Sequence, residues 1–188
     1  MTTPRKVAGL PIHDHPRPHW DDYRLRVDGL VARPLSLSEA ELRAMPQRAF
    51  DADFVCLAGW VAPEQHWSGV PLAEVLALAG AEGRANWVQA SAADFSWPMP
   101  VPEAVNALLA LDLGDEPIAP EHGAPVRLLV AGGECFTSIK WLEHLELCAR
   151  PMANTAERIA RARLEVDRPP DEKTAGGGLG ASFVAAAV

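Results

Sequence analysis

Asp53-Phe54-Val55-Cys56-Leu57-Ala58-Gly59-Trp60 places a cysteine between an apolar run and a glycine-bearing loop. Ahead of the cysteine, apolar residues alternate with aspartates over positions 50–54, which is the period-two pattern of a half-buried strand. Cys56 continues the inward-facing series and stands where this strand gives way to a loop. A thiolate there suits a transition metal or nucleophilic attack. Taken alone, the stretch favours the other interpretation, a buried cysteine that acts as a small hydrophobic residue.

Two further segments favour a functional role for Cys56 over a structural one. Glu121-His122-Gly123-Ala124-Pro125-Val126-Arg127-Leu128-Leu129-Val130 is followed, after a glycine pair, by Thr137-Ser138-Ile139-Lys140-Trp141-Leu142. With the cysteine segment and in this order, they resemble the molybdopterin-binding oxidoreductases of the sulfite oxidase type. The resemblance covers residues 23–147 and favours the bacterial single-domain branch, which includes the catalytic subunit of molybdenum-dependent sulfoxide reductases. It implies that family's α+β fold, with mixed sheets and short helices.

The resemblance also implies a set of site residues. Cys56 would be the catalytic residue and the protein ligand of molybdenum. Cys135 and Cys148 are expected to be structural, with the alternative that Cys135 lies close to the cofactor. The pterin and its phosphate would be held by polar side chains and by main-chain amides of one turn, at positions Ser91, His122, Arg127, Ser138, Ile139 and Lys140.

Arg127 is isolated in an apolar strand, where burying its charge without a partner would be costly. Its planar fork matches a phosphate or a carboxylate. The resemblance makes the cofactor its partner, and the alternative is a structural salt bridge with one of the 25 acidic residues.

The implied function is molybdopterin-dependent transfer of an oxygen atom to or from a small substrate, which could be an S-oxide, an N-oxide or a sulfite-like molecule. Residues 57–60 carry no cation, which makes anionic sulfite doubtful. The sequence shows no haem or iron–sulfur motif, so we expect a separate electron-transfer partner. The alternative is a catalytically inactive module of the same fold that binds pterin or another protein.

The composition limits the kinds of partner and the cellular location that we expect for this chain. A net charge of −8 argues against nucleic acid, which requires a basic face. Charged residues, glycines and prolines interrupt every apolar run before it reaches the length of a membrane span. Three widely spaced cysteines do not make a disulfide framework, and no export signal is visible. We therefore expect a reducing, cytoplasmic location.

Local patterns predict the remaining organisation. Strands are expected at 23–29, 87–91, 108–113 and 126–130, and helices after Ser38, from Pro71 to Ala79, after Pro102 and over 153–166. Short strands mixed with short helices, without regular alternation, independently indicate an α+β domain. We divide the chain into an N-terminal arm (1–22), an oxidoreductase domain (23–150) and a helical, then flexible, tail (151–188).

Overall fold

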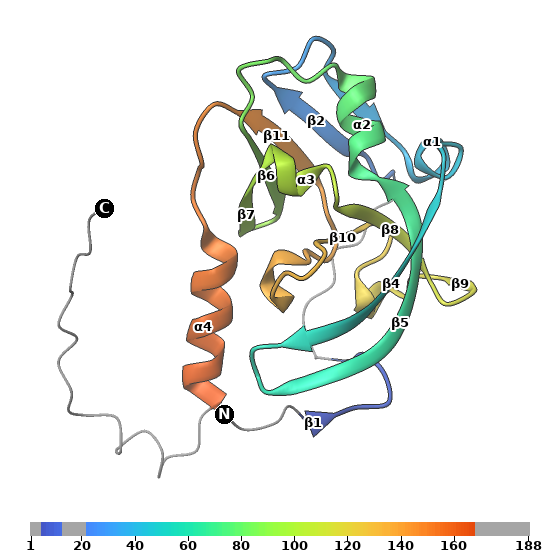
Figure 1. Cartoon of the computed structure of the whole chain (residues 1–188), viewed down its shortest axis with the longest axis vertical. Helices are drawn as coiled ribbons and strands as arrows, with labels where there is room; N and C mark the ends of the chain where they lie inside the picture. The colour runs from blue at the N-terminus through green and yellow to red at the C-terminus, as the bar shows by residue number, and fades with distance from the viewer. Residues whose placement is uncertain (1–4, 13–21, 168–188) are drawn as a thin grey trace, which may run out of the picture.

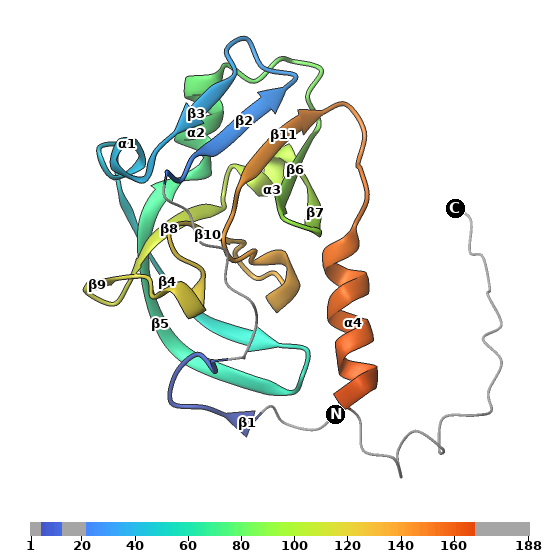
Figure 2. The ribbon, with the colours of Figure 1, turned by 180° about the vertical axis from the view of Figure 1, so that it is seen from behind.

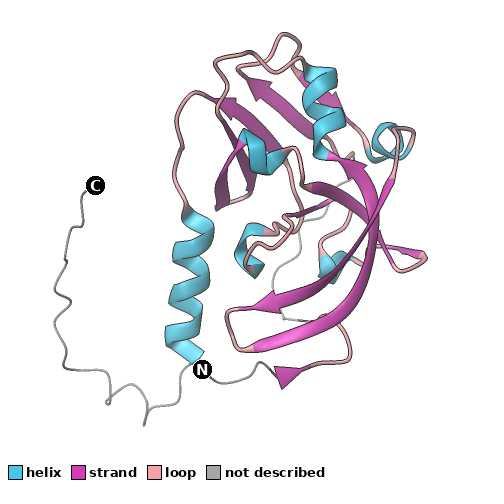
Figure 3. Ribbon diagram, in the orientation of Figure 1, coloured by secondary structure: helices cyan, strands magenta, loops and turns pink. Residues whose placement is uncertain are grey.

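Two β-sheets form the body of the protein (Figure 1). The computed structural model describes residues 5–12 and 22–167. Residues 1–4 and 13–21 of the predicted N-terminal arm, and residues 168–188 of the predicted tail, lie outside the described residues. Mixed sheets with a few short helices confirm the predicted α+β fold (Figure 3).

The first sheet carries the cysteine segment. Its strands run in the order β1-β5-β8-β10, while β4 pairs with β5 and β9 pairs with β8. β4 and β5 form a long, curved antiparallel hairpin that ends in the turn after Cys56. The bounds are β1 Arg5–Lys6, β4 Arg48–Cys56, β5 Trp60–Pro71, β8 Leu108–Leu113, β9 Glu116–Pro117 and β10 Arg127–Leu129.

The second sheet closes the opposite end of the molecule. Its strand order is β3-β2-β11-β6-β7, with β11 parallel to β2 and antiparallel to β6. The strands are β2 Leu25–Gly29, β3 Leu35–Leu37, β6 Trp87–Ala92, β7 Phe95–Pro100 and β11 His144–Cys148.

The helices are short except for the last. They are α1 Glu39–Arg43, α2 Leu72–Ala79, α3 Val101–Ala104 and α4 Thr155–Asp167, with the 3-10 turns η1 Pro120–His122 and η2 Cys135–Thr137. α4 packs along β7 and η2, so it lies on the side of the molecule that holds the Cys135 segment (Figure 2).

Most local predictions are confirmed, with corrections at element ends. Ser38 and Glu41 form the predicted capping box, whereas Ser36 lies within β3 and caps nothing. Pro71 is the residue before α2 rather than its first residue. β1, β3, β5, β7, β9 and β11 were not predicted. β7 contains two prolines, which a strand tolerates because it lies at the edge of the sheet.

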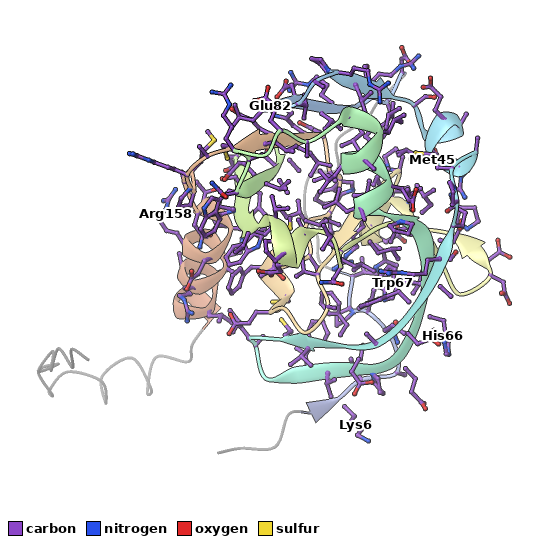
Figure 4. The ribbon with its side chains drawn as sticks, turned by 45° about the horizontal axis from the view of Figure 1, so that its top comes forward. Lys6, Met45, His66, Trp67, Glu82 and Arg158 are labelled. Atoms are coloured by element: carbon purple, nitrogen blue, oxygen red, sulfur yellow. The ribbon has the colours of Figure 1, made fainter. Side chains whose placement is uncertain are left out.

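Strand β5 separates the protein interior from solvent near the cysteine segment. Trp67 is 2% exposed and lies on the inner side, whereas its neighbour His66 points outward (Figure 4). Trp67 belongs to a small apolar cluster, distinct from the main core, together with residues of β8 and β10. This cluster forms the floor beneath the site described next.

Candidate molybdenum and pterin site

Cys56 is the last residue of β4, and a tight turn follows it. Gly59 has φ +78°, a left-handed conformation that favours glycine, and its amide donates to the Cys56 carbonyl at 3.0 Å. The Cys56 side chain is half-buried, and it lines a cavity of about 310 Å³. This volume lies at the lower end of the range for small-molecule sites. The predicted position of Cys56 at a strand end is therefore confirmed.

The cavity is formed by the inner face of β4 together with the chain that follows β10. Of the described residues that line it, only Asp53 and Glu134 carry a charge, and both are acidic. The other lining residues are apolar or small: Phe50, Ala52, Phe54, Val55, Cys56, Leu57, Trp67, Leu129, Val130, Gly132, Gly133 and Ser138.

Cys135 lies against Cys56, although the sequence led us to expect a structural role for it. It is the first residue of η2, and its sulfur is hydrogen-bonded to the Cys56 thiol. This bond lowers the pKa of Cys135, and the nearby Leu57 amide and Arg127 guanidinium act in the same direction. The same bond, with burial, raises the pKa of Cys56. The site thus presents two sulfur atoms rather than one.

Arg127 is buried beneath the cavity wall, with 3% of its surface exposed. Its guanidinium carbon lies 4.7 Å from the centre of the Phe54 ring and 5.3 Å from that of Trp67. One guanidinium nitrogen donates to the His122 carbonyl at 2.9 Å, while Nε has no partner. No carboxylate in the described part of the chain forms an ion pair with Arg127, so the salt-bridge alternative receives no support. Burial lowers the pKa of Arg127 to about 10.

Lys140 and His122 add two more groups to the same region. Lys140 Nζ donates to the Glu121 carbonyl at 2.6 Å. Burial and the neighbouring Arg127 lower the pKa of Lys140 to about 8. Burial, followed by Lys140 and Arg127, also lowers the pKa of His122, whose Nδ1 is buried without a hydrogen-bond partner. These groups form a positively polarised cluster, and an anion bound beside it would relieve their mutual repulsion.

The turn at residues 138–140 sits directly on the His122 segment. Gly123 approaches Lys140 so closely that a Cβ would come within 3.0 Å of the Lys140 Cα, and its φ is +117°. Trp141 ties the two segments together, since its amide donates to the Gly123 carbonyl at 3.1 Å and its indole to the Pro120 carbonyl at 2.7 Å.

The main-chain groups of this turn differ in what they can offer a ligand. The Ser138 amide already donates to the Cys135 carbonyl at 3.3 Å. The amides of Ile139 and Lys140 have no acceptor among the described residues, while the Ile139 side chain is fully buried in the core. Two successive amides beside a lysine can bind a phosphate.

Ser91 lies in β6 of the second sheet, opposite Ser96 on one side and His144 on the other. Like His122, Arg127, Ile139 and Lys140, it is not among the residues that line the cavity beside Cys56. Its proposed contact with the cofactor stays a prediction.

The donor set fits a molybdenum–pterin group. The described residues contain no cluster of three or more histidine, cysteine or acidic side chains that could hold a metal ion. A metal at Cys56 would therefore need donors beyond those that the described residues supply, as a dithiolene provides. The buried Arg127 Nε without a partner and the two unpaired amides match the anionic arm of such a group.

The comparisons with known proteins agree with this chemistry. The model of the family described as "Oxidoreductase molybdopterin binding domain" matches residues 12–156. The chain belongs to this family. Its Cys56 cavity and the neighbouring cluster of Arg127, His122 and Lys140 therefore lie in a molybdopterin-binding oxidoreductase domain of the sulfite oxidase type.

Individual relatives of this domain differ in length. The uncharacterized oxidoreductase YuiH of Bacillus subtilis is 30% identical over 142 residues, which cover 72% of this chain and 71% of that protein. A nitrate reductase of Phaseolus vulgaris is 28% identical over 74% of the chain, but this spans only 20% of the plant enzyme. The sulfane dehydrogenase SoxCD of Paracoccus pantotrophus superposes with a TM-score of 0.65 at 26% identity, covering 69% of this chain and 39% of that one.

No helix among the described residues is long and apolar enough to cross a bilayer.

Proposed function

We propose that the protein transfers an oxygen atom to or from a small neutral substrate, such as an S-oxide or N-oxide, at a molybdenum atom held by Cys56. The observation that carries this proposal is the half-buried thiol facing a cavity, with an unpaired buried arginine behind the wall. A structural cysteine would be surrounded by packed side chains, and a structural arginine would be paired with a carboxylate.

The residues of this chain would bind and orient the group. When bound, the molybdenum cofactor supplies the two-electron chemistry. Cys56 would hold the metal at the rigid end of β4, while Arg127, His122 and Lys140 neutralise the pterin arm. The Ile139 and Lys140 amides would receive the phosphate. Phe54 and Trp67 exclude water from the Arg127 guanidinium, which strengthens its attraction for an anion.

The charge of the cavity bears on the substrate. Asp53 and Glu134 are the charged side chains among its described lining residues. No cationic side chain stands among the described lining residues to hold sulfite or a similar anion, whereas a neutral S-oxide or N-oxide needs no such counter-charge. The names of the relatives do not decide the question, because they include nitrate reductases and a sulfane dehydrogenase.

A separate electron-transfer protein completes the proposal. Oxygen-atom transfer moves two electrons, and a dehydrogenase such as the structural neighbour must pass electrons to an acceptor. The cytoplasmic location also stays a prediction.

Metal content tests the proposal most directly. Protein expressed in a host that makes the molybdenum cofactor should contain about one molybdenum per chain and show a sulfur-to-metal charge-transfer absorption. Cys56→Ser should abolish this absorption and leave the fold intact by circular dichroism. Cys148→Ser is the matched control, because Cys148 lies in β11 of the other sheet, and it should keep both metal and absorption.

An activity assay distinguishes a working oxidoreductase from a catalytically inactive module of the same fold. With reduced viologen dyes, the loaded protein should turn over sulfoxides or N-oxides faster than it oxidises sulfite. Molybdenum bound without turnover of any member of the panel would favour a pterin-binding module. An unchanged absorption in loaded Cys56→Ser would remove Cys56 as the ligand.

A further inference from the structure

The site holds a second sulfur that the proposed chemistry does not use. Cys135 is hydrogen-bonded to Cys56, and its sulfur also lies beside the Leu57 amide in the turn after β4. Cys148 provides the contrast: its sulfur faces the carbonyls of Trp87 and Glu146, each at 3.8 Å. Two of the three cysteines, 79 residues apart in sequence (135 − 56), are thus brought together at the proposed metal position.

We infer that Cys56 and Cys135 form a reversible disulfide in the cofactor-free chain, and that this bond withholds the metal ligand until it is reduced. The inference rests on the proposed function in one respect, which is the role of Cys56 as ligand. It adds a modification site and a condition for cofactor loading.

The surrounding backbone favours the bond. Cys56 ends a strand and Cys135 begins a 3-10 turn, and these two elements contact each other. Sulfurs already within hydrogen-bonding reach need only a small shift to reach bonding distance, whereas cysteines on separated segments would require backbone movement. Both cysteines are half-buried, and Cys56 and Glu134 line the cavity, so a small reagent can reach the pair.

The chemistry balances with a small-molecule disulfide as the oxidant. The thiolate of one cysteine attacks glutathione disulfide, forms a mixed disulfide and releases one glutathione thiolate. The thiolate of the other cysteine then attacks the protein sulfur of that mixed disulfide. The internal S–S bond forms, and the second glutathione leaves as a thiolate. Two cysteine thiols have lost two electrons and two protons, and the oxidant has become two glutathione thiols.

Metal ligation and the disulfide are mutually exclusive, because both use the same Cys56 electron pair and valence. Loaded protein should therefore resist oxidation at this pair. Oxidised apoprotein should be unable to acquire molybdenum through Cys56, and reduction should restore that ability.

The test uses the full chain expressed in a host that lacks the molybdenum cofactor. Apoprotein is equilibrated with glutathione disulfide, alkylated, digested and analysed by mass spectrometry. We expect a peptide pair linking Cys56 to Cys135, with Cys148 alkylated. Cys148→Ser should give the same linkage, whereas Cys135→Ser should give none and carry glutathione on Cys56 instead. Dithiothreitol should remove the linkage, and molybdenum-loaded protein treated identically should not form it.

Loading is then measured as molybdenum per chain after exposure of oxidised apoprotein to the cofactor, with and without dithiothreitol. Uptake should be at least tenfold lower without the reductant. Glutathione adducts alone, linkages through Cys148, or equal uptake by oxidised and reduced chains would overturn the inference. A linkage in a chain that binds no molybdenum under any condition would instead refute the proposed function. Loading through Cys56 without any linkage would refute the inference alone.

Discussion

The second sheet and the Cys56 end of the first sheet differ in how deeply they bury their inward side chains. In the second sheet, the inward residues of the three central strands are apolar and almost completely inaccessible: Leu25, Val27, Val88, Ala90, Leu145 and Leu147. At the Cys56 end of the first sheet, the inward face of β4 is only half-buried and opens on a cavity. Beneath it lies a buried arginine with an unsatisfied nitrogen.

This difference separates residues that stabilise the fold from residues that await a ligand. Apolar burial favours folding in proportion to area, and the second sheet uses it throughout. A buried charge without a carboxylate opposes folding by several kcal/mol, and the rings of Phe54 and Trp67 offset only about 2 kcal/mol of that. Substitutions at the two ends should therefore affect different properties.

The largest effect on stability is expected in the second sheet. Leu145→Ala removes a fully buried side chain at the centre of the sheet, and should lower the free energy of unfolding of the apoprotein by about 2–5 kcal/mol. Urea denaturation followed by tryptophan fluorescence measures it. Because Leu145 is not among the residues that line the cavity, the variant that remains folded should retain a wild-type ratio of molybdenum to chain. A selective loss of molybdenum would contradict the view that the second sheet stabilises the fold while the Cys56 end binds the cofactor.

Arg127→Met should instead keep the stability of the apoprotein and weaken its retention of the cofactor. Removing an unpaired buried charge while keeping much of the volume should leave apoprotein stability within about 1 kcal/mol of wild type, or raise it. Loss of a charged partner for the pterin arm should weaken cofactor retention roughly 10- to 100-fold, which corresponds to about 1.5–3 kcal/mol. Unfolding curves and released pterin fluorescence measure the two effects. A collapse of apoprotein stability would make Arg127 a structural residue.

The smallest effect concerns pH and Lys140. Its pKa of about 8 means that the side chain is already protonated below pH 8, where retention of an anionic ligand should not vary with this group. Above pH 8 the ligand-free lysine loses its proton, so binding must restore it. Retention should then fall by up to about tenfold per pH unit. Lys140→Met should bind more weakly at neutral pH and lack this slope, and an equal slope in the variant would assign the titration to another group.

The sequence predicted much of the site because its motifs are contiguous. The alternation before Cys56 located β4 and its end, and the run from Val126 to Val130 located β10. The isolation of Arg127 in that run already signalled a buried charge in need of a partner. The resemblance to the sulfite oxidase family supplied the identity of the cofactor, which residue patterns alone could not.

Other parts of the site could not be predicted, because they arise from long-range packing. Nothing in the local sequence around Cys135 indicates that η2 folds back onto the end of β4. The aromatic rings around Arg127 come from β4 and β5, and both lie at least 60 residues earlier in the chain. Strand β11 was not predicted either, although it joins β2 to β6 at the centre of the second sheet.

The amino-acid order by itself determined the α+β class, the strand-end cysteine and the cationic and amide-rich segments, because periodicity and motif spacing are local properties. Only the tertiary structure decided that Cys135 meets Cys56, that Arg127 lacks a carboxylate partner and that Ser91 lies away from the cavity. Those relations depend on which strands become neighbours, and hydrogen bonding and packing between distant segments fix that choice.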